Sequence, residues 1–187
     1  MVKKVGMLLL AAFLAFRSYE LVNSLVVSGN KNLSAVLSLL VSFLLVLFVT
    51  GIFAFPGFVF PTSRILPAAY YRIRYPERLS RISRWLGVDY FRRLLLVAFW
   101  GREKQRKKYF DGTKNGISNL DYQTRQSEFG HLAPFFLLLF ISFRLLMEGY
   151  TGVFIGIVVL NILANGYPIL LQRVHRIRIQ ALYKRMG

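Results

Sequence analysis

Hydrophobic and polar positions lie in separate long blocks along the chain rather than alternating. Two apolar blocks fall in the first third and two in the last third, each close to the roughly 20 residues that cross a bilayer as a helix. Arg17 and Glu20 interrupt the first block three positions apart, so they either pair on one helical face or lie near the interface and extend toward water. We predict an all-α integral membrane protein with about four transmembrane helices, covering residues 5–27, 35–60, 132–147 and 152–171.

The segment between the second and third spans, residues 61–130, has a different composition. It holds 15 Lys and Arg against 6 Asp and Glu, a net charge of +9. Short amphipathic stretches at 68–74, 78–86 and 91–100 indicate interfacial helices, although the last could instead be re-entrant. Interleaved aromatic and basic residues at 70–75 (YYRIRY) predict a belt at the membrane surface. Asp111-Gly112 and Asn115-Gly116 predict turns before the chain re-enters the membrane. We treat residues 1–187 as a single membrane domain with a basic tail at 172–187.

The charge of the whole chain refines this topology. Lys and Arg number 25 against 8 Asp and Glu, giving +17, while 55% of the residues are hydrophobic. Such a charge alone would suit a nucleic-acid partner, but here it lies between apolar blocks, as the positive-inside rule describes. We expect membrane lipids with anionic headgroups as partners and no nucleic acid. We also expect a multi-pass protein of a bacterial-type inner membrane with both termini cytoplasmic. The chain has no Cys, which excludes thiol nucleophiles and disulfides.

Polar residues of the last third follow a helical spacing. Glu128 and His131 lie one turn apart where the third span begins. On the fourth span, one helical face carries a stripe of polar residues and a proline: Asn161, Asn165, Pro168, Gln172 and then His175 or Arg176. Polar side chains on a membrane helix point into the bundle, so the two elements predict a polar pocket that opens at the cytoplasmic interface.

This pocket would hold the residue types needed for group transfer to a hydroxyl. Glu128 would orient His131, which would act as general base. The amides of Asn161, Asn165 and Gln172 would bind substrate or a developing oxyanion, and Arg173, Arg176 and Arg178 would bind donor phosphates or lipid headgroups. Each feature also has a structural explanation: helix-dipole stabilisation of Glu128, amide-mediated helix packing and the positive-inside signal. A single Glu-x-x-His is half of a di-metal pattern, so no metal site is expected.

These motifs together resemble a known family. The blocks 126–131 (QSEFGH), 165–168 (NGYP) and 172–178 (QRVHRIR) are similar to the glycosyl-4,4'-diaponeurosporenoate acyltransferases of staphyloxanthin-type carotenoid biosynthesis, most clearly over residues 121–182. The resemblance implies transfer of a fatty acyl group to a sugar hydroxyl on a glycosylated carotenoid. It implies no bound cofactor, with acyl-CoA or a similar donor as co-substrate. His175 departs from the Asn of the family.

The leading hypothesis is therefore a membrane acyltransferase acting on a hydroxyl of a membrane-bound, glycosylated, carotenoid-like acceptor. The alternative is a non-catalytic lipid- or pigment-binding subunit of a larger complex, whose partners would be other membrane proteins.

Overall fold

The computed structural model describes residues 2–98 and 114–186, and every described element is a helix. Four of the helices are long and apolar enough to cross a membrane, which confirms the predicted fold class. The chain divides into two compact units, residues 1–61 with 130–166 and residues 62–129 with 167–187. The turn expected at Asp111-Gly112 lies outside the described residues, and the turn expected at Asn115-Gly116 is wrong, because both residues belong to the helix Lys114–Met147.

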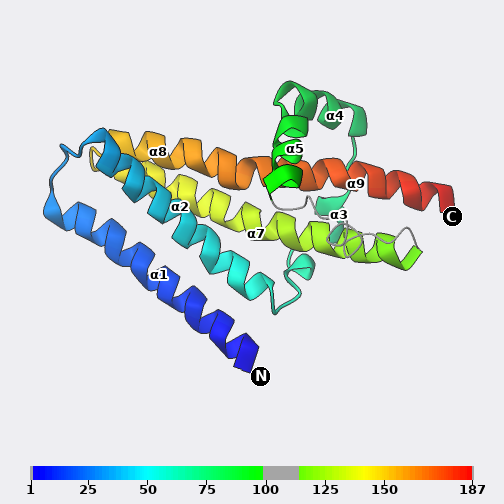
Figure 1. Ribbon diagram of the computed structural model, residues 1–187, viewed down its shortest axis with the longest axis horizontal. Helices are drawn as coiled ribbons and strands as arrows, with labels where there is room; N and C mark the ends of the chain where they lie inside the picture. The colour runs from blue at the N-terminus through cyan, green and yellow to red at the C-terminus, as the bar shows by residue number, and fades with distance from the viewer. Residues whose placement is uncertain (1, 99–113, 187) are drawn as a thin grey trace. The chain divides into compact units, whose positions relative to one another are not determined.

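The first unit is a bundle of apolar helices. It contains α1 (Val2–Ser28), α2 (Ala35–Gly57), the second half of α7 (Lys114–Met147), α8 (Thr151–Asn161) and the π-helical turn η2 (Ile162–Gly166). In Figure 1, α1 runs beside α2, and α2 also packs on α8. The core residues come from several of these helices and include Leu45, Leu138 and Ile157. Large apolar side chains on the outside stay exposed in the isolated chain, as expected of a surface that faces lipid.

Small residues bring α2 and α8 into close contact. Gly152 and Gly156 of α8 face Ser38 and Ser42 of α2, and a Cβ atom added to Gly156 would lie 2.8 Å from Ser42 Cβ. The Ser42 hydroxyl also lies 3.0 Å from the carbonyl oxygen of Val153. Because lipid supplies no hydrophobic drive for helix association, this close backbone approach and the interhelical hydrogen bond hold the pair together.

The second unit contains the helices that follow the second span and the last one. These are η1 (Thr62–Arg64), α3 (Ala68–Tyr71), α4 (Pro76–Trp85), α5 (Val88–Ala98), the first half of α7 and α9 (Tyr167–Met186). The Tyr167 hydroxyl donates a hydrogen bond of 2.8 Å to the carbonyl oxygen of Leu86, and its ring packs 5.2 Å from that of Phe91. These contacts attach the α4–α5 connection and α5 to the start of α9.

The last two long helices extend beyond the predicted spans. Helix α7 begins at Lys114 rather than near residue 132, and the helical path that starts at Thr151 continues to Met186 rather than ending near residue 171. Hydropathy marks only the part of a helix that lies in lipid, whereas the polar parts of α7 and α9 are held by pairing with each other within the second unit. In α1, the Arg17 and Glu20 side chains pair at 2.5 Å, as expected, and both are about half exposed.

Candidate functional site

The residues that the sequence pattern placed in one pocket fall into two groups, one in each unit. His131, Asn161 and Asn165 belong to the first unit, and Glu128, Gln172, Arg173, Arg176 and Arg178 belong to the second.

The group in the first unit is a chain of hydrogen bonds around Asn165. The Asn165 amide nitrogen donates to Asn161 Oδ1 at 2.9 Å and to Thr50 Oγ1 at 3.0 Å. Its amide oxygen lies 3.0 Å from His131 Nδ1. Asn161 and Asn165 are fully buried, whereas His131 is partly exposed. The π-helical turn that begins after Asn161 carries Asn165, and such turns are frequent at functional sites.

A backbone carbonyl determines the direction of this chain. The Asn161 amide nitrogen donates at 2.9 Å to the carbonyl oxygen of Phe135, which can only accept. Asn161 therefore presents its oxygen to Asn165, and Asn165 in turn presents its oxygen to His131. His131 must consequently carry its proton on Nδ1, because that nitrogen faces an acceptor. The Ala164 backbone also forms a hydrogen bond with this imidazole. In a neutral imidazole with its proton on Nδ1, the lone pair is on Nε2, which is the form of histidine that can remove a proton from a hydroxyl.

The group in the second unit is a buried ion-pair cluster. Glu128 on α7 pairs with Arg176 on α9, and both side chains are almost completely buried. Arg173 Nη1 lies 3.6 Å from the other oxygen of Glu128. Arg176 also reaches Thr124 Oγ1 at 3.5 Å. The arginines neutralise the buried carboxylate, which would otherwise be costly to remove from water.

Two tyrosines of α3 cover this cluster. The Arg173 guanidinium lies 4.9 Å from the centre of the Tyr70 ring, and that of Arg176 lies 4.7 Å from the Tyr71 ring. Burial and the negative charge of Glu128 raise the pKa of Tyr70 to about 12, and the same two causes raise the pKa of Tyr71. Both hydroxyls therefore remain protonated at physiological pH. The surface belt expected at residues 70–75 is wrong for Tyr71, which is 1% exposed because it stacks on arginine.

The remaining predicted residues lie on α9. Gln172 donates at 3.1 Å to the Ser127 hydroxyl, and Arg178 is exposed. The partner expected for His131 differs from the one observed, because Glu128 faces arginines and Asn165 faces the imidazole. Within the described residues, no three His, Asp or Glu side chains gather as metal ligands would.

Several contributors to these groups were missed at the sequence level. Thr50 was not singled out because it shares the most apolar block with two other hydroxyl residues, Ser38 and Ser42, although a polar residue at such a depth is itself a signal. Tyr70 and Tyr71 were assigned to the membrane surface because interleaved aromatic and basic residues usually lie there. No sequence signal marks the Phe135 carbonyl as the end of the hydrogen-bond chain.

The described helices define an all-helical membrane protein whose candidate spanning helices bury hydrogen-bonded polar side chains. A family model described as glycosyl-4,4'-diaponeurosporenoate acyltransferase matches residues 67–185. The chain belongs to this family, which confirms the resemblance noted in its motifs. Membership supports acyltransferase activity in a carotenoid pathway. Neither a curated protein nor a solved structure matches the chain.

Proposed function

We propose that this protein transfers a fatty acyl group from an activated donor to a hydroxyl of a membrane-bound, glycosylated, carotenoid-like acceptor, with His131 as the general base. The observation that carries the proposal is the hydrogen-bond chain from Phe135 through Asn161 and Asn165 to His131. It leaves the Nε2 lone pair on a partly exposed side chain in a membrane helix.

The reaction needs one base and no redox partner. His131 Nε2 takes the proton of the acceptor hydroxyl as the oxygen forms a bond to the acyl carbon. The bond between that carbon and the donor's thiolate or alkoxide then breaks, and His131 returns the proton to the leaving group. The Asn165 carbonyl oxygen accepts from Nδ1 throughout and stabilises the transient imidazolium. Because Asn165 uses both amide protons within its cluster, it is not assigned a role in binding the oxyanion.

Glu128 and Arg176 have a different role in this proposal. Their buried pair joins the first half of α7 to α9 within the second unit, and Arg173 and Tyr70 close the cluster from one side. Glu128 is therefore proposed as a positioning residue rather than as the partner of His131. Arg176 is not proposed as a phosphate ligand, because its charge is already paired with Glu128 and its side chain is only 1% exposed.

We further propose an inner-membrane location with both termini on the cytoplasmic side. The four candidate spans support this topology, because an even number of crossings leaves both ends on the same side. The basic residues gather in the segment 61–130 and in the tail, which the positive-inside rule assigns to the cytoplasm.

Turnover by the isolated protein tests the proposed activity. The purified chain in detergent is mixed with a glycosylated carotenoid and an acyl-CoA, and the product is examined by mass spectrometry. We expect the acceptor to gain the mass of one acyl group while free CoA accumulates. A protein that forms no ester with acyl-CoA or with phospholipid as donor, and that purifies in fixed proportion with other membrane proteins, would instead be a non-catalytic subunit.

A further inference from the structure

A groove in the second unit lies between α4 and α9. It has a volume of about 410 Å³ and is lined by Pro76, Glu77, Ser80, Arg81 and Arg84 from α4 and by Ile177 from α9. This volume is in the usual range for sites that bind small molecules. None of these residues belongs to the buried cluster around Glu128.

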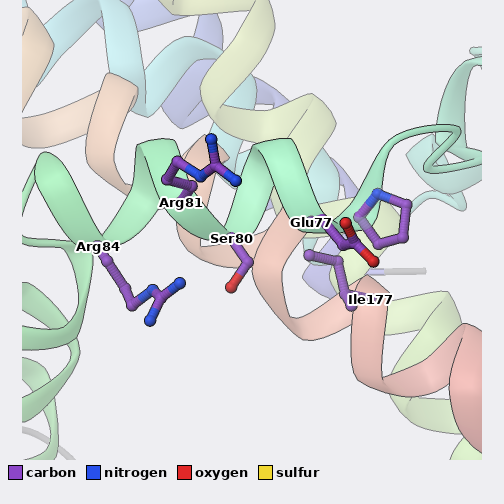
Figure 2. A pocket seen from close by; sticks show the side chains of 6 residues that line it. Glu77, Ser80, Arg81, Arg84 and Ile177 are labelled. Atoms are coloured by element: carbon purple, nitrogen blue, oxygen red, sulfur yellow. The ribbon is translucent and has the colours of Figure 1, made fainter.

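Helical spacing explains why the polar residues share one face. Glu77, Ser80 and Arg84 are three and four positions apart, so their side chains leave α4 on the same side. Pro76 begins the helix, where its missing N–H costs nothing. Ile177 supplies an apolar wall from α9, as Figure 2 shows.

No described residue neutralises the arginines of the groove through an ion pair. In the described part of the chain, the arginines that form ion pairs are Arg17, Arg92, Arg125, Arg144, Arg173 and Arg176. Arg81 and Arg84 form none with another described residue, and both are exposed. In Figure 2 the Arg84 guanidinium lies on the same side of α4 as the Ser80 hydroxyl, whereas the Arg81 guanidinium points to the other side of the helix. Within the described part of the chain, no carboxylate forms an ion pair with either guanidinium.

The groove is also polarised along its length. In Figure 2, Arg84 lies at one end, Ser80 lies in the middle and Glu77 lies beside Ile177 at the other end. Guanidinium and hydroxyl groups donate to phosphate oxygens, whereas a carboxylate repels them. A ligand that fits both ends carries a phosphate near Arg84 and a hydroxyl or amino donor near Glu77.

We propose that this groove binds the phosphate ester of the acyl donor, with Arg84 and Ser80 on the phosphate, Arg81 adding positive charge beside them, and Glu77 accepting from a neighbouring hydroxyl or amino group. The assignment of the ligand as donor rests on the proposed function. Two donors share this chemistry, a soluble CoA thioester and a phospholipid with a hydroxylated or amino headgroup. The sequence pattern assigns donor binding to Arg173 and Arg176, but both arginines pair with Glu128. The groove is proposed for that role instead.

Binding measurements with the purified full chain in detergent test this assignment. The His131→Ala background is used so that no donor is consumed. One arm measures CoA binding by calorimetry, and the other measures retention of phosphatidylglycerol against phosphatidylcholine in mixed micelles. The test variant combines Arg81→Ala with Arg84→Ala. Arg78→Ala is the matched control, because Arg78 is on the same helix but stacks on Tyr75 and does not line the groove.

We expect the double variant to weaken binding by about tenfold or more in one arm, since each arginine–phosphate contact contributes more than a neutral hydrogen bond. The control should stay within about twofold of the parent, because general electrostatic attraction alone is weak at physiological salt. A change in the CoA arm identifies the soluble donor, and a change in the lipid arm identifies the headgroup. Unchanged binding in both arms, or an equal loss in the control, would overturn the proposal.

The groove and the proposed activity can fail separately. If the double variant loses binding but the parent protein with His131 intact makes no ester, the groove stands and the acyltransferase proposal falls. If ester is formed and Arg81→Ala with Arg84→Ala leaves both binding and the KM for the donor unchanged, the activity stands and the groove proposal falls. Circular dichroism and size-exclusion profiles matching the parent show that the variant is folded.

Discussion

At the scale of single residues, the partner of His131 is an amide rather than a carboxylate. An ionised carboxylate in an apolar bundle carries a large desolvation cost, and Glu128 meets this cost by pairing with arginine. The Asn165 amide is neutral, so it can be fully buried and still accept from an imidazole nitrogen. The same i, i+3 spacing that suggested a Glu–His pair is therefore compatible with two side chains that have different partners.

Removing the Asn165 side chain tests whether its amide oxygen orients the His131 imidazole. Asn165→Ala deletes the acceptor facing His131 Nδ1, so the imidazole loses its fixed tautomer and orientation. We expect kcat to fall on the order of tenfold or more while the KM for the acceptor changes little. Thr50→Val is the control, because Thr50 contacts Asn165 and not the imidazole. Equal losses in the two variants would show that the cluster acts only through packing.

The Glu128–Arg176 pair makes a prediction about stability. Glu128→Leu leaves a buried guanidinium without its main partner, so we expect the variant to be destabilised by about 3 kcal/mol or more. Adding Arg176→Leu removes the uncompensated charge and should recover much of that loss. Thermal unfolding in detergent measures both variants. A double variant less stable than the single one would show that the pair is not the source of the effect.

At the scale of helices, two kinds of contact hold the chain together. Helices α2 and α8 meet through glycine and serine, where close approach replaces apolar burial. Helices α7 and α9 meet through ion pairs and a hydrogen bond between Gln172 and Ser127 in the second unit. The first kind suits a lipid environment, and the second lets both helices continue beyond their apolar parts.

The close contact between α2 and α8 predicts that adding one methyl group at Gly156 lowers the stability of the protein. Gly156→Ala would place a Cβ 2.8 Å from Ser42 Cβ, so the helices must separate. We expect a loss of about 1–3 kcal/mol, as for other overpacked contacts. Gly6→Ala on α1 is the matched control, since a Cβ there meets no atom within 4 Å and alanine favours a helix. Thermal unfolding that does not distinguish the two variants would contradict the close packing.

Across the whole molecule, the spanning helices were predictable because hydropathy reports directly on lipid burial. The candidate residues of α7 and α9 were predictable as well, since polar side chains on apolar helices have to be satisfied. Their pairing was not predictable. Which of Glu128 and Asn165 faces His131 depends on helix rotation and on a π-helical turn, and neither leaves a clear periodic signal.

The absence of cysteine makes the proposed topology directly measurable. Asn30→Cys lies in the connection between α1 and α2, and Lys184→Cys lies near the end of α9. With both termini cytoplasmic, a membrane-impermeant maleimide should label the first variant in intact cells. The second should be labelled only after the membrane is permeabilised. The reverse pattern would place the termini outside the cell.

One comparison tests the central claim most directly, because the chain has only two histidines. Ester formation by the purified protein is measured for His131→Ala and for His175→Ala, each checked for yield and unfolding temperature. We predict that His131→Ala lowers the rate by roughly 100-fold or more, as expected on loss of a general base, while His175→Ala retains most of it. Full activity in a folded His131→Ala protein would contradict catalysis by His131.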